Sequence, residues 1–278
     1  MDYMAEKPAG IEAGTLSASK IDRMPRGGPD ASCLDRLLQT DRLEYLDRDS
    51  DVPVDAARKR SVIRALEWTG GWFGSTERFA EIALAEVENV ADPKILELGA
   101  GHGALSRTLL DWHPSARLTV TDVDAANVAA MAACDLGENP RVTVHEMDAT
   151  AIDAPDASFD LAVFALSFHH LPPAAAARAI SEGTRVAGKL VVIDLPRPPS
   201  PLHLVRLATM LPFVPLLPFV HDGVISSLRS YSPSALRALA AYADPAIAVE
   251  LRGGLLSPQV VVAQRGAPDP LRPNGQRW

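Results

Sequence analysis

The chain has 278 residues and a formal net charge of −8. Its two cysteines, Cys33 and Cys134, form neither a disulfide framework nor a metal-binding pattern, so we expect a reducing, cytoplasmic compartment. Its length exceeds the ~100–150 residues of a common domain, and 47% hydrophobic residues are enough for one large, ordinary core. Residues 95–195 carry 6 basic and 13 acidic side chains, which argues against nucleic acid as a partner because phosphate backbones require clustered basic residues.

The two ends of the chain differ in composition from its middle. Residues 1–30 combine Gly, Pro, Ser and charged residues without an apolar run, so we predict a disordered arm rather than a signal peptide. Residues 31–75 are predicted to form a helical cap, residues 76–265 the main domain, and residues 266–278 a disordered tail. Apolar residues at helical spacing predict three helices before the sheet: 33–46, 56–68 and 76–90.

From Pro93 onward, short apolar runs alternate with helical segments. The predicted strands are 94–98, 117–121, 141–146, 159–166 and 189–195, and the helices between them are 104–112, 125–134 and 173–185. This alternation is typical of a parallel sheet covered on both faces by helices. After a helix over 233–243, two strands over 246–251 and 259–264 follow one another, which predicts an antiparallel pair at the end.

Residues 196–230 form an apolar insert after the fifth strand. Its segment 202–220 is 19 residues long, close to the ~20 needed to cross a bilayer. Pro212, Pro215 and Pro218 each remove a helical donor, so we expect no spanning helix. We predict instead a helix over about 202–211 followed by an extended proline-rich stretch, with His221-Asp222-Gly223 as a plain turn.

The strongest motif is a glycine-rich turn between the first strand and its helix, ILELGAGHG at residues 95–103. Glycines permit a tight turn and bring backbone amides close to a ligand, and the following helix N-terminus favours a polar group. Asp122 lies 23 residues after Gly99, at the end of the second strand, where a carboxylate can accept ribose hydroxyls. This pair of features fits a nicotinamide dinucleotide and S-adenosylmethionine equally well.

Three further features separate the two cofactors. Glu97 stands two residues before Gly99, Met147-Asp148-Ala149 ends the third strand, and the fourth strand leads into SFHHL at residues 167–171. With these motifs the chain resembles the class I S-adenosylmethionine-dependent methyltransferases, in particular the small-molecule branch that includes the quinone-biosynthesis methyltransferases. The resemblance covers about residues 76–265. It implies an α/β, Rossmann-like, doubly wound sheet of seven strands in the order 3-2-1-4-5-7-6, with the last strand antiparallel.

The resemblance also implies a role for each motif residue. The backbone of Gly99, Ala100, Gly101 and Gly103 would contact the amino-acid part of the cofactor, and Glu97 would help to hold its ammonium group. Asp122 would accept the ribose hydroxyls. The residues implied to contact the adenine or the sulfonium side are Val123, Asp148, Ala149 and Ala165.

Methyl transfer requires alignment of a nucleophile with the methyl group, and a general base only where that nucleophile must lose a proton. His169 and His170 follow the fourth strand at the edge where ligands bind in such sheets, and they are the candidate catalytic residues. The alternative is that they only shape the loop. Asp194, His221 and Asp222 are weaker candidates.

We expect a small, apolar methyl acceptor because the insert 196–230 is apolar and suits a lid over the substrate, completed by Tyr45, Trp68, Trp72 or Phe73. A core helix, a homodimer contact and a membrane-surface patch are alternative uses of the insert. If it is a lid, a charge at Leu207 or Phe213 should impair turnover more than cofactor binding. An inactive cofactor-binding module and a nicotinamide oxidoreductase are the alternative functions.

Overall fold

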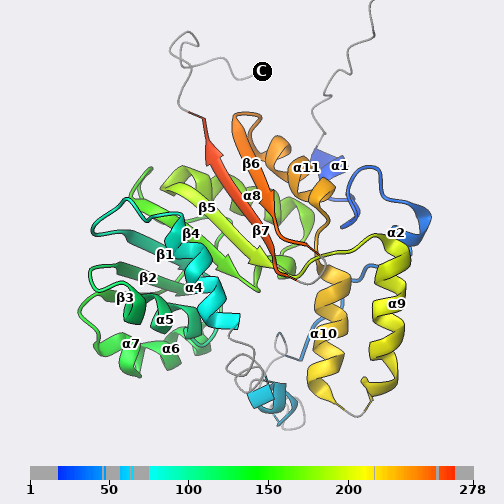
Figure 1. Ribbon diagram of the computed structural model, residues 1–278, viewed down its shortest axis with the longest axis horizontal. Coiled ribbons are helices and arrows are strands. Elements are labelled where there is room, and N and C mark those ends of the chain that lie inside the picture. Colours follow the sequence, from blue (N-terminus) through cyan, green and yellow to red (C-terminus); the bar gives the residue numbers. More distant parts are fainter. Residues whose placement is uncertain are drawn as a thin grey trace, which may run out of the picture.

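The computed structural model describes residues 18–45, 47, 57–62, 64–65, 75–215, 217–254 and 257–266. Seven strands form one sheet in the order β3-β2-β1-β4-β5-β7-β6 (Figure 1). The strands are β1 (Lys94–Leu98), β2 (Arg117–Asp122), β3 (Val142–Glu146), β4 (Phe159–Ala165), β5 (Ala187–Asp194), β6 (Ile247–Arg252) and β7 (Gln259–Arg265). The first five are parallel, and β7 is antiparallel to both β5 and β6. This topology confirms the predicted fold class and strand order.

The helices that follow the strands also lie close to their predicted positions. Those packed around the sheet are α4 (Ser75–Ala85), α5 (Ala104–Trp112), α6 (Ala125–Ala132), α7 (Asp135–Glu138), α8 (Pro173–Val186) and α11 (Pro233–Ala243). Helix α4 ends at Ala85 rather than at 90, and α7 was not predicted. Ser232 caps α11 by accepting the N–H of Ala235, as its position before Pro233 suggests.

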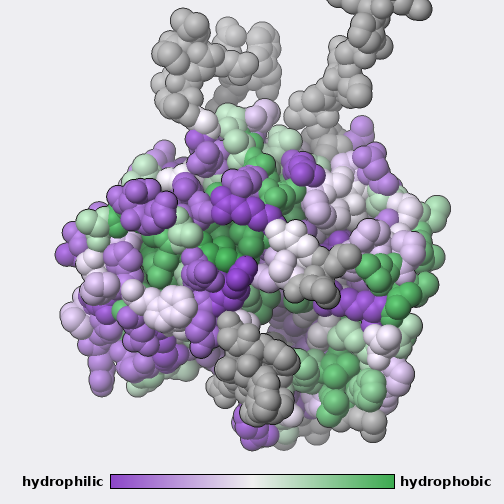
Figure 2. All heavy atoms as spheres, in the orientation of Figure 1, coloured by the Kyte–Doolittle hydropathy of each residue, from purple (hydrophilic) through white to green (hydrophobic). Residues whose placement is uncertain are grey.

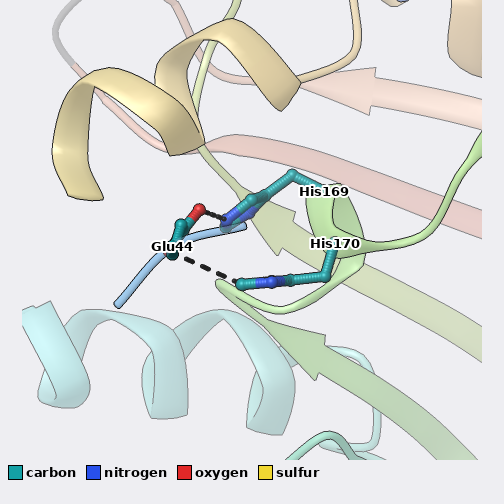
Figure 3. Close-up of side chains that lie close together, drawn as sticks. All are labelled: Glu44, His169 and His170. Carbon is teal, nitrogen blue, oxygen red and sulfur yellow. Dashed lines mark ion pairs between the residues drawn. The ribbon is translucent and has the colours of Figure 1, made fainter. Parts of the chain in front are cut away.

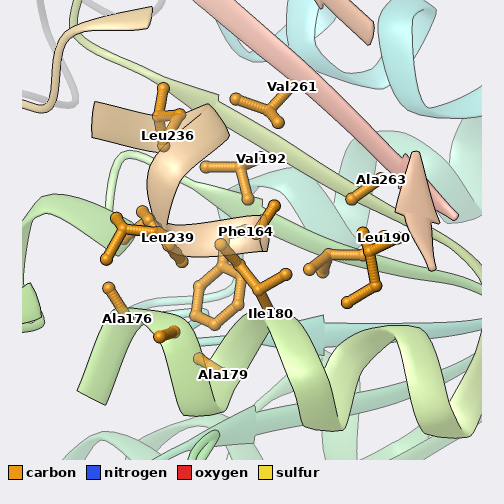
Figure 4. Packing of buried hydrophobic residues seen from close by; sticks show 14 of the residues in the cluster. Phe164, Ala176, Ala179, Ile180, Leu190, Val192, Leu236, Leu239, Val261 and Ala263 are labelled. Atoms are coloured by element: carbon orange, nitrogen blue, oxygen red, sulfur yellow. The ribbon is translucent and has the colours of Figure 1, made fainter. Parts of the chain in front are cut away.

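Side chains alternate between the two faces of the sheet, and each face has its own core. On one face Ile95, Val163 and Val191 pack with α4, α5 and the α6–α7 pair. On the other, Leu96 and Phe164 pack with α8 and α11 in the cluster drawn in Figure 4. Because both faces are covered, the central strands read as unbroken apolar runs in the sequence.

The insert after β5 differs from the prediction. Helix α9 (Ser200–Met210) is close to the predicted helix, but the expected proline-rich extended stretch is wrong. A short 3-10 turn, η2 (Leu211–Phe213), is followed by a second helix, α10 (Pro218–Arg229), and α9 and α10 stand beside the sheet as a hairpin (Figure 1). Pro218 occupies the first turn of α10, where its missing N–H costs nothing, and Leu217 before it is extended.

The expected plain turn at 221–223 is therefore also wrong, since these residues lie within α10. Among the described residues, no helix combines the length and apolar character that crossing a membrane would require.

The N-terminal part also departs from expectation. Helix α1 (Ala18–Ile21) and buried Ile21 and Met24 show that residues 18–30 are packed rather than forming a disordered arm. Helix α2 spans Cys33–Leu37 and ends well before the predicted residue 46. At its end, the carbonyls of Asp35 and Leu38 accept hydrogen bonds from the Arg197 guanidinium instead of continuing the helix. Residues 57–62 and 64–65 are helical, as predicted. The rest of that helix, residues 1–17 and the tail after 266 lie outside the described residues.

Candidate active site

The glycine loop connects β1 to α5 at the carboxyl edge of the sheet. Gly99, Gly101 and Gly103 have φ angles of 66°, 58° and 72°, in the left-handed region that favours glycine. Gly103 is the N-cap of α5 and provides no side-chain hydrogen bond to the helix. The N-terminus of α5 therefore offers backbone amides without a side-chain cap, although the amide of Ser106 is directed to Glu97.

The surroundings of the three glycines differ, and the difference locates the ligand space. A Cβ at Gly99 would lie 2.8 Å from Oγ of Ser167, and one at Gly103 would overlap Cδ1 of Leu136. A Cβ at Gly101 would meet nothing within 4 Å. Gly99 and Gly103 thus allow the loop to pack against the protein, whereas Gly101 borders open space of the kind a bound cofactor fills.

Asp122 ends β2 and holds the loop from the side. One carboxylate oxygen accepts the N–H of Gly101 at 2.7 Å, and the other accepts the N–H of Asp124 at 2.8 Å. The carboxylate is buried. A carboxylate has further lone pairs, so these two bonds leave acceptor capacity at the edge of the loop.

The remaining predicted cofactor residues surround the same edge. Val123 is 70% exposed, which is unusual for an apolar residue directly after a buried strand. Asp148 is exposed and accepts the N–H of Thr150 at 2.8 Å, while Ala149 and Ala165 are half-buried. The structure thus brings the predicted set to the carboxyl ends of β1, β2, β3 and β4.

Glu97 lies beneath the loop with only 2% of its surface exposed. The hydroxyl of Ser106 on α5 donates a hydrogen bond to its carboxylate. Burial, reinforced by the nearby charge of Asp122, raises the pKa of Glu97 to about 7 although the Ser106 bond opposes this shift. A buried acid of this kind is poised to lose its proton when a cation arrives.

His169 and His170 form the 3-10 turn η1 (Phe168–His170) just after β4. His169 is buried, and its Nδ1 lies 2.7 Å from Oδ1 of Asp194 at the end of β5. The other Asp194 oxygen accepts the backbone N–H of His169 at 2.8 Å. Asp194, a weaker candidate in the sequence, thus orients the imidazole of His169.

Glu44 faces both imidazoles from one side, and its two oxygens are directed at different rings (Figure 3). Its carboxylate is 3.5 Å from Nε2 of His169 and 3.9 Å from Nε2 of His170. Burial disfavours the charge of His169, but Asp194 and Glu44 outweigh burial and raise its pKa to about 9. Although burial opposes it, the contacts of Glu44 with His169 and His170 keep the pKa of Glu44 below its ordinary value.

His170 has a second set of partners. Its Nδ1 is 2.9 Å from Oδ1 of Asp47, and its carbonyl accepts a hydrogen bond from the Arg229 guanidinium at 3.0 Å. Arg229 also pairs with Asp47 at 2.6 Å. The side chain of His170 is 28% exposed, so His170 is more accessible than His169.

Residues 21–45, the N-terminal strap, bring Glu44 to this position. The buried guanidinium of Arg26 donates to the carbonyls of His169 and Arg229 and lies over the ring of Tyr231. The backbone N–H of Tyr45 donates to Asp222 on α10, and the Ser226 hydroxyl donates to Glu44 at 2.8 Å. The strap thereby covers the carboxyl ends of β4 and β5.

Sequence reasoning missed Glu44, Asp47, Arg26 and Arg229, because no motif marks them and only the fold brings them to the histidines. Of the residues suggested to complete a pocket, Tyr45 packs against the ring of His221. Trp68, Trp72 and Phe73 lie outside the described residues.

The sheet order, the glycine loop with its open Gly101 position and the acids at the ends of β1 and β2 define a class I S-adenosylmethionine-dependent methyltransferase fold. Residues 95–189 match the family described as methyltransferase domain. This match covers about a third of the chain and agrees with the resemblance to the class I methyltransferases, whose cofactor is S-adenosylmethionine.

Two curated relatives are similar to this chain. A malonyl-[acyl-carrier protein] O-methyltransferase of Geobacter sulfurreducens is 36% identical over 105 residues, which cover 38% of each chain. A demethylmenaquinone methyltransferase of Thermus thermophilus is 28% identical over 193 residues, covering 64% of this chain and 86% of that one. The match to the first relative thus spans well under half of its length.

Solved structures agree on the fold. Human N-acetylserotonin methyltransferase in complex with SAM aligns with a TM-score of 0.55 and 17% identity, covering 84% of this chain and 66% of that one. The plantazolicin methyltransferase BpumL aligns with a TM-score of 0.54 and 11% identity, covering 75% and 90%. At these identities the likeness concerns the fold alone.

Proposed function

We propose that the protein transfers the methyl group of S-adenosylmethionine to a small, largely apolar acceptor. The observation that carries this proposal is the open space at Gly101, bordered by the Asp122-tethered loop and placed above buried Glu97. When bound, S-adenosylmethionine supplies an electrophilic methyl group on a sulfonium. The reaction is then a displacement in line with the departing sulfur, for which positioning provides much of the acceleration.

The chain's own groups suit the parts of this cofactor. We assign the amides of the glycine loop and α5 to its carboxylate and Glu97 to its ammonium, since each pairs opposite charges in a buried place. Asp122 retains acceptor capacity for ribose hydroxyls, exposed Val123 offers a surface for the adenine, and Asp148 with Ala149 would meet the adenine edge. Ala165 lies near the reacting side, at the end of β4.

The histidine pair is proposed to position the acceptor rather than to take its proton. A pKa of about 9 leaves His169 protonated at neutral pH while it contacts Asp194 and Glu44, and a protonated imidazole cannot act as a base. His170 is the more exposed member and is the one assigned to the acceptor. Its position beside the ends of β4 and β5 places it next to the cofactor edge of the sheet.

Support for an apolar acceptor comes from the insert. Six large apolar side chains of α9, η2 and the segment after η2 are exposed, and Figure 2 shows the apolar surface that they help to form: Leu202, Leu204, Val205, Leu211, Phe213 and Leu217. An acceptor or a second copy of the chain that covers this surface would remove apolar area from water.

Transfer from cofactor labelled on its methyl group tests the proposal. The acceptors are a prenylated quinol and an acyl-carrier-protein-bound carboxylate, which represent the two curated relatives, with a hydrophilic amine as control. We expect labelled product that extracts into organic solvent with the quinol and none with the amine. Tight binding of S-adenosylhomocysteine without any labelled product, also in a metabolite extract, would support an inactive binding module instead.

Phe213→Asp tests whether the insert contacts the acceptor. Phe213 is 51% exposed, so the charge should not disturb the core, and losing an apolar contact worth ~1.5–3 kcal/mol should raise KM about 10- to 100-fold. Affinity for S-adenosylhomocysteine should stay the same. Leu207 is buried and no longer suits this test, because a charge there would destabilise the protein.

Trp112→Asp is the matched control, since this apolar residue is also exposed and ends α5, outside the insert. Steady-state kinetics and light scattering are measured for all three proteins. Equal KM values for Phe213→Asp and the wild type would remove the insert from the acceptor site. A dimer that dissociates only in Phe213→Asp would assign the surface to a homodimer contact.

A further inference from the structure

The side chains of Glu44, His169 and His170 form a cluster at the place that the proposed function assigns to the methyl acceptor. One ligand atom of each residue can be chosen so that all three lie within 4.8 Å of one another. Figure 3 shows both imidazoles directed at the carboxylate, which approaches from the N-terminal strap. Two imidazoles and one carboxylate are ligands that zinc and other divalent transition metals prefer.

Each imidazole is oriented by a carboxylate on its far nitrogen. Nδ1 of His169 contacts Asp194 at 2.7 Å, and Nδ1 of His170 contacts Asp47 at 2.9 Å. An N–H directed to these carboxylates leaves the lone pair of each Nε2 facing Glu44. Metal-binding histidines are commonly held in this way, because the outer carboxylate sets the tautomer and strengthens the ligand.

A second observation concerns Nε2 of His169. The side chain is only 4% exposed, yet among the described residues this nitrogen has no hydrogen-bond partner. Oε1 of Glu44 is 3.5 Å from this nitrogen and already accepts the hydroxyl of Ser226. A buried polar atom without a partner is costly, and a ligand between His169 and Glu44 would satisfy it.

The spacing is close to that of a coordinated ion. Ligands at 2.0–2.1 Å from a tetrahedral centre lie about 3.3 Å apart. Oε1 of Glu44 is 3.5 Å from Nε2 of His169 and Oε2 is 3.9 Å from Nε2 of His170, so the side chains must move closer before one carboxylate oxygen and both nitrogens reach that value.

The charges also suit a divalent cation. With neutral imidazoles, Glu44, Asp47 and Asp194 contribute three negative charges, and Arg229 supplies one positive charge. The firm contacts of Arg229 are Asp47 at 2.6 Å and the carbonyl of His170 at 3.0 Å. It lies 3.4 Å from Nδ1 of His170 and 3.8 Å from Glu44. The buried guanidinium of Arg26 adds one more positive charge beside His169, which leaves a net negative charge that a bound cation would offset.

We propose that Glu44, His169 and His170 bind one divalent transition-metal ion, with zinc as the best match to two imidazoles and a carboxylate. Three protein ligands leave a coordination position open, as in catalytic rather than structural zinc sites. An oxygen atom of the methyl acceptor is the chemistry that this open position would take. The ion would also attach the N-terminal strap to the ends of β4 and β5.

Cobalt(II) titration of the full, untagged, metal-stripped chain tests the proposal, because cobalt in such a site has visible absorption bands. We expect one Co²⁺ per chain, displaced by Zn²⁺, and a melting temperature several degrees higher with metal than without. Asp47→Asn removes the carboxylate that contacts Nδ1 of His170 and pairs with Arg229, and it should weaken binding by about 10- to 100-fold. Glu44→Gln and His170→Asn should weaken it further.

His145→Asn is the matched control, since His145 is an exposed histidine on β3 outside the cluster. It should bind cobalt like the wild type. Circular dichroism of each metal-free variant shows whether it is folded, and Asp47→Asn provides a milder variant if Glu44→Gln is not. The absence of tetrahedral cobalt bands in the wild type, or equal binding by the wild type, Glu44→Gln and His170→Asn, overturns the proposal. Neither readout depends on methyl transfer, so the result is independent of the proposed function.

Discussion

Glu97→Gln is expected to weaken binding of S-adenosylhomocysteine by about 10- to 100-fold and at the same time to stabilise the ligand-free protein above pH 7. A hydrogen bond between charged groups contributes ~1.5–3 kcal/mol, and the neutral amide loses most of this toward the ligand's ammonium. Without ligand, burial of the carboxylate and the nearby charge of Asp122 make its ionised form unfavourable.

The pH dependence of stability follows from the raised pKa of Glu97. Burial moves this pKa from its ordinary value of 4.5 to about 7, so between these values the folded state binds more protons than the unfolded chain. The stabilising contribution of Glu97 is complete below about pH 4.5 and is lost as the pH rises through 7. At pH 8 the variant should therefore gain up to about 3 kcal/mol relative to the wild type.

Urea unfolding at pH 5 and pH 8, with calorimetric titration of S-adenosylhomocysteine, measures both effects. Glu138→Gln is the matched control, because Glu138 is exposed at the end of α7 and should change neither property. A variant that loses stability equally at both pH values, with unchanged affinity, would show that Glu97 is a structural partner of Ser106 and not a ligand residue.

Alanine at Gly101 and at Gly103 should have opposite main effects although both glycines are left-handed. Gly103→Ala should lower the free energy of unfolding by about 3 kcal/mol, because left-handed backbone costs ~1–2 kcal/mol and the new methyl group overlaps Leu136. Gly101→Ala should cost only about 1–2 kcal/mol in stability, since its Cβ meets nothing. It should weaken cofactor binding about 10- to 100-fold, because the methyl group enters the ligand space.

Chemical denaturation and ligand titration of the two variants form one comparison in which each serves as the control for the other. Leu136→Ala combined with Gly103→Ala should recover part of the lost stability, since it removes the atom that the methyl group overlaps. If Gly101→Ala binds S-adenosylhomocysteine as tightly as the wild type, the open space beside the loop is not the cofactor site.

The sheet was predictable because its signals are local. Strands β4 and β5 are buried on both faces and therefore appear as apolar runs, and the glycine loop needs left-handed residues at fixed positions. The position of Asp122 beside Gly101 follows from the pairing of β1 with β2. Motif and topology thus determine the cofactor edge together.

The insert was harder to predict because proline interrupts the interior of a helix but is favourable in its first turn. Pro218 would interrupt an existing helix, but it is compatible with the first turn of a new one, and the sequence pattern alone did not separate these cases. Helix α2 was predicted too long for another reason. Its last carbonyls are bonded by Arg197, which is distant in the sequence.

The chemistry of the histidine cluster could not be predicted from the SFHHL motif alone. His169 and His170 were identified from their place after β4, but their chemistry depends on Glu44 and Asp47 from the N-terminal part of the chain. The buried neighbours make His169 a poor base, which no property of the SFHHL motif indicates. Charge and burial are properties of the assembled site.

Calorimetric titration of the full chain with S-adenosylhomocysteine tests the central claim most directly. We predict one binding site per chain, with weaker binding in Glu97→Gln and Gly101→Ala and unchanged binding in Glu138→Gln. No heat of binding at millimolar ligand, in a protein shown to be folded, would contradict the assignment of the glycine loop to this cofactor.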